Sequence, residues 1–300
     1  MLEESASLLL KNQNPDGGWG AVAGKGSNVE ATALALLALH SLARGSDGHP
    51  VEKAKRWLTD SQNPDGSWPL NNATKGASWC TALAMIASSE FADQKDRVGQ
   101  AGNWVLQQQG SKPGILANVI RALSFQKRVV HLNEDLVGWS WTPNSFSWVE
   151  PTSYFLLALK KMRSALAGKA FQERIEQGEL LIYDRMCEHG GWNYGNAAVY
   201  GDALWPYPDI TAIALIALQD RRDRKENQMS LRALSDMMQT TDSGLALAWS
   251  LICFSVYGRD ESALRKRLEE RFVKTKFLGE TKAIALGILA SGNGARYFRV

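Results

Sequence analysis

The stretch VEATALALLAL (residues 29–39) is an apolar, alanine-rich segment, and variants of it recur along the whole chain of 300 residues. The other copies are SWCTALAMIA (78–87), PGILANVIRAL (113–123), VEPTSYFLLAL (149–159), PDITAIALIAL (208–218), TDSGLALAWSL (241–251) and GETKAIALGIL (279–289). Anchored at Thr32, the repeats follow one another at steps of 33 to 59 residues. A period in this range is typical of helical arrays, whose units cannot bury their apolar face alone.

Amphipathic segments alternate with these apolar ones. They span residues 2–13, 50–62, 95–109, 171–186, 229–239 and 262–274, with apolar residues at helical spacing and charge on the other face. The alternation predicts an all-α fold, an (α/α)6-type toroid of six to seven helical hairpins, with apolar helices inside and amphipathic helices outside. We expect a single domain over residues 1–300. The fourth unit offers only residues 126–137 for an outer helix, which predicts an abbreviated unit and six full pairs.

Similar turns join the outer helices to the inner ones. QNPDGGWG (13–20) and QNPDGSW (62–68) are nearly the same peptide, and VGWSW (137–141) and HGGWNYG (189–195) are looser relatives. Asn-Pro-Asp-Gly forms a tight turn, because proline fixes φ and glycine accepts a positive φ. We expect the glutamine to bond backbone groups at the helix end and the tryptophan to brace the turn.

The order Gln, Gly, Trp at the end of an outer helix resembles the QW motif of the squalene-hopene and oxidosqualene cyclases. Class II diterpene cyclases and protein prenyltransferase β subunits share the same α/α toroid. The resemblance covers essentially the whole chain and implies the fold more than the activity, because QW motifs brace the barrel. Cyclases with two barrels are about twice as long, so the resemblance implies that one barrel is missing here or is supplied by a partner, as a second barrel or a homodimer.

Composition narrows the functional classes. A hydrophobic content of 45% is enough for one large core, and a net charge of +3 gives no case for a nucleic-acid partner. The sequence shows no signal peptide and no apolar stretch of the roughly 20 residues that span a bilayer, although peripheral membrane contact stays open. Three cysteines without metal-like spacing predict reduced thiols in a cytoplasmic protein. We expect neither a metal nor a cofactor.

Acidic residues recur two positions before the threonine of most repeats. They are Glu30, Glu150, Asp209, Asp242 and Glu280. Parallel inner helices would gather these acids at one rim of the barrel. One interpretation is helix capping, since an acid in the first turn complements the helix dipole. The other is that one acid donates a proton.

The second interpretation is strongest at Asp209. Class II cyclases carry Asp-x-Asp-Asp-Thr-Ala at the start of an inner helix, and the middle aspartate protonates an alkene or epoxide. The segment Tyr207-Pro208-Asp209-Ile210-Thr211-Ala212 matches at the middle aspartate, the threonine and the alanine, whereas Tyr207 and Ile210 replace the other two aspartates. The resemblance implies Asp209 as the acid. From their places in the repeats we add two candidate residues, Glu150 as a like-charged neighbour and His189 on the preceding turn as a group that pairs with Asp209.

Aromatic residues precede two of these acids. Candidate substrate-binding residues are Trp79, Trp148, Tyr154, Trp205, Tyr207 and the rim acid Glu30. Aromatic faces stabilise carbocations in cyclase cavities, but large aromatic residues also fill a small barrel.

Function is therefore predicted only as a class. The first hypothesis is a terpene cyclase-like protein that binds an isoprenoid or other hydrophobic small molecule and cyclises it by protonation. The first alternative is a non-catalytic toroid that holds a lipid or a protein. The second is a glycosidase-like α/α barrel, since glycosidases use two carboxylates about 5–10 Å apart, a role open to Glu150 and Asp209.

Overall fold

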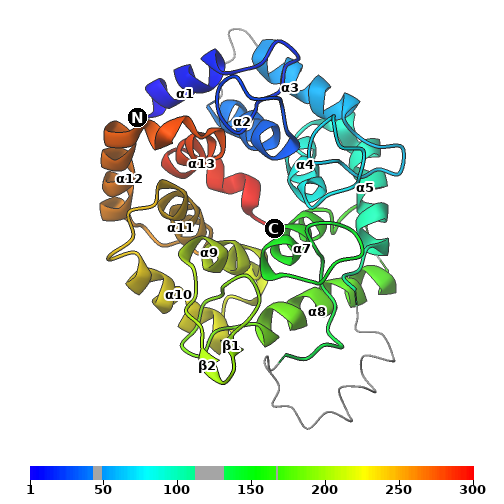
Figure 1. The fold of residues 1–300 in the computed structure, drawn as a ribbon, viewed down its shortest axis with the longest axis vertical. Helices are drawn as coiled ribbons and strands as arrows, with labels where there is room; N and C mark the ends of the chain where they lie inside the picture. Colours follow the sequence, from blue (N-terminus) through cyan, green and yellow to red (C-terminus); the bar gives the residue numbers. More distant parts are fainter. Residues whose placement is uncertain (43–48, 112–131, 167) are drawn as a thin grey trace.

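The computed structural model describes residues 1–42, 49–111, 132–166 and 168–300, which form two concentric layers of helices around one axis (Figure 1). In the described part of the chain the inner layer comprises α2 (Val29–Ser41), α4 (Cys80–Ser88), α7 (Val149–Lys161), α9 (Pro208–Ala217), α11 (Gly244–Val256) and α13 (Thr281–Ser291). The outer layer there comprises α1 (Leu2–Lys11), α3 (His49–Asp60), α5 (Lys95–Gln107), α8 (Lys169–Asp184), α10 (Lys225–Met237) and α12 (Ser262–Thr275).

The two layers differ in how their helices are buried. Residues 31–38 of α2 are all buried, as an inner helix requires. The outer helix α12 buries Leu264, Leu268 and Phe272, which lie on one face at a spacing of four residues. Each inner helix packs against its neighbours, and α13 packs against α2, so the ring closes. The predicted all-α toroid is confirmed.

The third and fourth repeats are described only in part. The apolar repeat at residues 113–123 lies outside the described residues, as does half of the segment expected to form the fourth outer helix (residues 126–131 of 126–137). The ring closes without them, because α4 packs directly against α7. The indole of Trp139 donates to the carbonyl of Val105 at 3.0 Å, so α5 serves as the outer helix of α7. The described helices thus form six pairs.

The turns are braced as the QW-like sequences predict. Nε2 of Gln13 donates to the carbonyls of Gly17 and of Pro50 in the next outer helix, at 2.8 and 2.9 Å. The indole of Trp19 donates back to Leu9 of α1 at 2.8 Å. Gly17 has a φ of +95°, and a Cβ there would lie 2.7 Å from the carbonyl of Lys53. Only glycine fits this turn.

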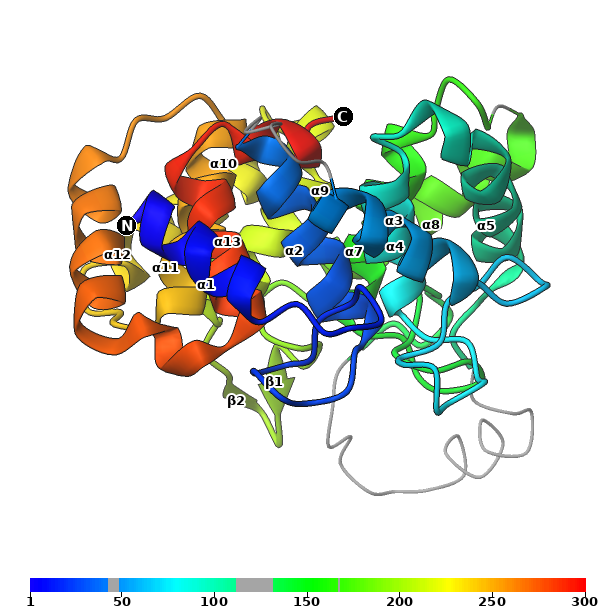
Figure 2. The same ribbon diagram turned by 90° about the horizontal axis from the view of Figure 1, so that it is seen from above.

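The inner helices are parallel and begin at the same end of the barrel (Figure 2). The turns lie at this end, together with a hairpin of β1 (Ala198–Val199) and β2 (Asp202–Ala203), the only sheet among the described residues. Short 3-10 helices complete the described elements: η1 (Ala92–Gln94), η2 (Gln219–Arg221), η3 (Lys276–Gly279) and η4 (Gly294–Phe298).

The C-terminal segment closes the opposite end of the barrel, where Figure 1 places the C-terminus near the axis. Phe298 of η4 is fully buried and packs edge-on against Trp249 of α11, with ring centroids 5.3 Å apart. Gln219 donates to the carbonyl of Phe298 at 2.7 Å and accepts from the backbone N–H of Val300 at 3.2 Å. One end of the axis is therefore filled and satisfied by hydrogen bonds.

A buried lysine joins three elements near the C-terminal ends of α7 and α9. Nζ of Lys160 lies 2.6 Å from Glu179 of α8 and 2.5 Å from Asp220 of η2. It also donates to the carbonyl of Ala217 at 2.8 Å. Two carboxylates and a carbonyl offset the desolvation of the buried ammonium, so this group ties the layers together.

Candidate functional site

Backbone hydrogen bonds at the N-terminal end of the barrel set the register of the inner helices. The N–H of Val29 donates to Leu70, that of Val149 to Tyr194, and that of Thr281 to Ala21, at 2.8 to 3.0 Å. Each acceptor is the second residue after the tryptophan of a QW-like turn, namely Trp68, Trp192 or Trp19. The three donors therefore occupy equivalent positions. The residues that follow them, Glu30, Glu150 and Lys282, are therefore equivalent too.

This register corrects the alignment of the last repeat. The sequence pattern aligned Lys282 with Thr32 and placed Glu280 in the row of acids. The structure instead places Lys282 in that row, where its Nζ lies 2.6 Å from a carboxylate oxygen of Glu30. Helix α2 is capped by Asn28, whose side chain accepts from the N–H of Ala31 at 2.8 Å. Glu30 thus pairs with a cation and does not cap its helix.

Lys282 is the positively charged residue that pairs with the rim acid Glu30, and its ammonium group remains charged. Burial lowers the pKa of Lys282, but attraction by Glu30 and Glu150 outweighs it, so the net pKa is raised. A lysine held this way positions neighbouring carboxylates and cannot act as a neutral base at ordinary pH.

The carboxyl of Glu150 has a raised pKa in the folded protein. Burial is the largest effect on its pKa and raises it, and repulsion from Glu30 and Asp209 acts in the same direction. Attraction by Lys282 and a hydrogen bond from Trp141 lower the pKa but do not cancel the rise. Carboxyl groups with a raised pKa are the ones that hold a transferable proton.

Tyr154 is a buried residue close to the rim acids. Its side chain is fully buried, and its hydroxyl has no hydrogen-bond partner among the described residues. The ring stacks on Trp79 at 5.2 Å between centroids and meets the edge of Trp249 at 6.0 Å. Burial raises the pKa of Tyr154 well above its usual value, and the charges of Glu150 and Glu30 add to the rise. A buried hydroxyl without a partner is costly, so a bound polar group would gain by meeting it.

Four aromatic rings form a chain along the rim. Trp148 lies 5.2 Å from Trp141, Trp141 lies 6.0 Å from Tyr194, and Tyr194 lies 5.6 Å from Tyr207, measured between ring centroids. Tyr194 and Tyr207 are 42% and 48% exposed. Because these rings are partly open to solvent, they offer apolar faces beside the acids.

The structure brings together most residues predicted for the site. Glu30, Trp79, Trp148, Glu150, Tyr154, Tyr207 and Asp209 lie at the N-terminal rim. Asp242 does not join them, since its carboxylate is 82% exposed and its nearest cation is Arg267, at 3.9 Å.

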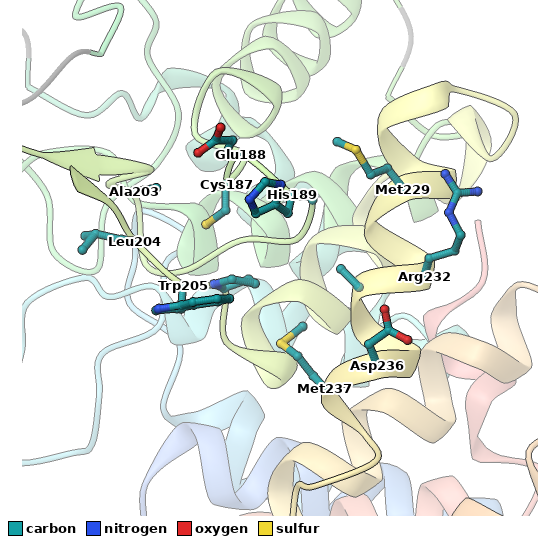
Figure 3. A pocket seen from close by; sticks show the side chains of 13 residues that line it. Cys187, Glu188, His189, Ala203, Leu204, Trp205, Met229, Arg232, Asp236 and Met237 are labelled. Carbon is teal, nitrogen blue, oxygen red and sulfur yellow. The ribbon is translucent and has the colours of Figure 1, made fainter. Parts of the chain in front are cut away.

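His189 and Trp205 lie elsewhere. Both line a pocket beside the outer helix α10 (Figure 3), and Trp205 is 80% exposed. The expected pairing of His189 with Asp209 does not appear among the hydrogen bonds and ion pairs of the described residues.

Sequence reasoning missed Lys282, Trp141, Tyr194 and Cys80. The spacing from the tryptophan of the turn would have found Trp141 and Tyr194, because each stands two residues after it. Cys80 borders Tyr154 and Glu30, and burial, with the charge of Glu30, raises the pKa of its thiol to about 12. The thiol is therefore not a nucleophile here.

No group of three or more histidine, cysteine, aspartate or glutamate side chains is arranged to hold a metal ion in the described part of the chain. None of the helices described combines the length and the apolar character needed to cross a bilayer.

Part of the chain is similar in sequence to a known protein family. Residues 2–113 match the family model of the squalene-hopene cyclase N-terminal domain. No curated protein matches the sequence.

Solved structures match over nearly the whole chain. A variant of the type II terpene cyclase MstE from Scytonema, in complex with geranylgeranyl dihydroxybenzoate, is 14% identical with a TM-score of 0.62 and covers 99% of this chain and 98% of its own. An inactive α-1,6-mannanase variant from Salegentibacter, in complex with α-1,6-mannotriose, is 13% identical with a TM-score of 0.59, over 99% and 100% of the two chains. An α-amylase from Clostridium perfringens is 10% identical with a TM-score of 0.63, over 97% of each chain.

At these identities the structural matches establish the fold alone, and terpene cyclases share it with glycosidases. The family match, the braced QW-like turns and the closed ring of inner helices agree with one another. The chain folds as an α/α toroid, and its residues 2–113 are similar to the squalene-hopene cyclase N-terminal domain.

Proposed function

We propose that the protein binds an isoprenoid-like hydrophobic substrate at the N-terminal rim of the barrel and cyclises it by protonation. The observation that carries the proposal is Glu150, a desolvated carboxyl with a raised pKa beside two further carboxylates. It lies above a buried tyrosine hydroxyl without a partner. The similarity to a terpene cyclase bound to a geranylgeranyl compound supports the same class of substrate.

The acid in this proposal is the pair of Glu150 and Asp209, with the proton on Glu150. The sequence motif favoured Asp209. Repulsion from Asp209 and Glu30 favours the protonated form of Glu150, while Lys282 keeps Glu30 paired at 2.6 Å. Asp209 thus acts through Glu150, because its negative charge keeps the proton on Glu150 and so keeps that proton available for transfer.

The aromatic residues supply the second requirement of a cyclase. A carbocation formed beside Glu150 would lie within reach of the rings of Trp79, Tyr154 and Trp141, whose π-systems stabilise positive charge. Tyr194 and Tyr207 extend the apolar surface outward and would hold the remainder of the chain.

Glycoside hydrolysis is the second candidate, favoured by the carboxylates on neighbouring inner helices and by the similarity to the mannanase. Such enzymes use one carboxyl with a raised pKa as acid and a second, ionised carboxylate as base or nucleophile. Glu150 and Asp209 would take these parts, and the aromatic faces would stack on sugar rings.

The test is turnover by the full chain on two panels: linear prenyl alcohols and squalene, and α-linked mannose and glucose oligosaccharides. We expect cyclised products from the first panel and a loss of about 10²- to 10⁴-fold in Glu150→Gln, with a smaller loss in Asp209→Asn. Glu269→Gln, an exposed acid on α12, should leave turnover unchanged.

The alternatives give different results. Sugar release without prenyl cyclisation would support the glycosidase. Binding of a prenyl compound without turnover would leave the toroid as a non-catalytic lipid-binding scaffold. Unchanged cyclisation in Glu150→Gln would move the acid to Asp209.

A further inference from the structure

A cavity lies outside the ring of inner helices. It has a volume of about 480 Å³ and opens between α10, the turn at residues 187–190 and the segment at residues 203–206 (Figure 3). Small-molecule sites typically have volumes of about 300–1,000 Å³. None of the rim acids lines this pocket, so it is separate from the site proposed above.

The wall of the pocket is mostly apolar, and the side chain of Trp205 in it is unusually exposed. Figure 3 shows His189 and Trp205 on one side and Met229 and Met237 of α10 on the other. Trp205 is 80% exposed, and its indole has no ring contact or hydrogen bond among the described residues. This indole differs from the buried indoles of the turns and leaves a π-face free for a ligand.

The negative charges that line the pocket outnumber the positive ones. Arg232 and Asp236 lie one turn apart on α10, a spacing at which opposite charges attract. Glu188 lies across the pocket on the preceding turn and has no ion-pair partner within the described chain. The lining therefore carries one carboxylate more than its cations balance.

We propose that this pocket binds a hydrophobic organic cation, an ammonium carried on an apolar body. The π-face of Trp205 attracts the cation through its quadrupole, and Glu188 supplies the opposite charge. Met229 and Met237 have flexible, polarisable side chains that adapt to the apolar part of a ligand. A carboxylate-bearing ligand would meet Arg232 but would be repelled by Glu188 and Asp236.

The experiment compares three probes of similar shape on the full chain. They are phenyltrimethylammonium, uncharged tert-butylbenzene and anionic 3-phenylpropionate, followed by the tryptophan indole resonances in ¹H–¹⁵N NMR spectra. The Trp205 resonance is assigned by its absence in Trp205→Ala. We expect saturable shifts with phenyltrimethylammonium, at least about fivefold tighter binding than with tert-butylbenzene, and the weakest binding with the anion.

Variants test the two groups that recognise the cation. Trp205→Ala should weaken binding about tenfold and Glu188→Gln about threefold. The matched control is Tyr200→Ala, which removes a ring that is 77% exposed on the adjoining hairpin and does not line the pocket. It should leave binding unchanged. Melting temperatures within a degree of wild type would show that all three variants are folded.

Three results would overturn the proposal. They are equal or tighter binding of the anion or the neutral probe, unchanged affinity in Trp205→Ala, and absence of any saturable shift with the three probes. None of these results depends on turnover at the rim, so the cyclase proposal and this one fail separately.

Discussion

The tryptophans of the turns and the aromatic residues of the rim lie at the same end of the barrel but are held in opposite ways. Trp19, Trp68 and Trp192 are at most 1% exposed, and each indole donates to a carbonyl ten residues earlier in an outer helix. Trp148 and Tyr207 are partly exposed and contact other rings instead. A tryptophan that braces a turn and a ring that could bind a ligand therefore differ in what the side chain contacts, and not in residue type.

Polar side chains show the same contrast. The hydroxyl of Thr81 accepts from the N–H of Trp68 at 2.8 Å, and Thr152 and Thr211 do the same for Trp139 and Trp192 at 2.9 Å. The hydroxyl of Tyr154 has no such partner in the described structure. The braces are therefore satisfied without a ligand, whereas the rim retains groups that a ligand would satisfy.

Trp68→Ala gives the largest expected effect on this comparison. It removes a buried indole together with its 2.7 Å hydrogen bond to Leu58 and should lower the free energy of unfolding by about 3–5 kcal/mol. Denaturant unfolding followed by circular dichroism measures it.

The matched change at the rim is Trp148→Ala. It removes one ring contact at 5.2 Å from a half-buried residue and should cost no more than about 1.5 kcal/mol. Equal losses in the two variants would show that the rim rings brace the barrel as the turn tryptophans do.

Thr81→Val gives the next smaller effect. Valine keeps the shape of threonine but cannot accept from the buried N–H of Trp68, so we expect a loss of about 1–3 kcal/mol. Thr142→Val, at an exposed position of the turn before α7, should change stability by no more than about 0.5 kcal/mol. A neutral Thr81→Val would mean that water can reach the turn.

The fold was largely predictable, because the repeats share the same pattern of apolar and amphipathic segments joined by similar turns. Apolar helices such as 29–39 and turns such as QNPDGGW have local causes, in periodicity and in turn chemistry. The pairing of α5 with α7 was not predictable. It depends on the hydrogen bond of Trp139 to Val105, 34 residues away, and on a ring that closes past residues 113–123.

The site was predictable only in part. Residues that follow the common register, Glu30, Glu150 and Asp209, were found from their position before a threonine. Lys282 was assigned to the wrong position, because the last repeat has no threonine in register and only the bond of Thr281 to Ala21 reveals the shift. Trp205 lies four residues and His189 twenty residues before Asp209 in the sequence, yet both line the pocket beside α10. Sequence proximity does not determine the direction of a side chain in a long loop.

The smallest expected effect concerns the charge of Glu150. Its pKa is raised in the folded protein, chiefly by burial, so folding favours its protonated form. The stability that this group contributes is full below its unfolded pKa, about 4.3, and is lost as the pH rises through the raised folded pKa. At neutral pH the ionised carboxylate therefore opposes folding.

Glu150→Gln replaces that carboxyl with an uncharged group of the same shape. We expect the difference in melting temperature, variant minus wild type, to increase as the pH rises from 4 to 7. Lys282 loses one of its three attractive carboxylates in this variant but keeps Glu30 at 2.6 Å, so the ion pair persists. Glu269→Gln should give a flat difference over the same range. A difference that falls with pH in Glu150→Gln would show that attraction by Lys282 outweighs burial, in which case Glu150 is ionised at the rim and cannot be the proton donor.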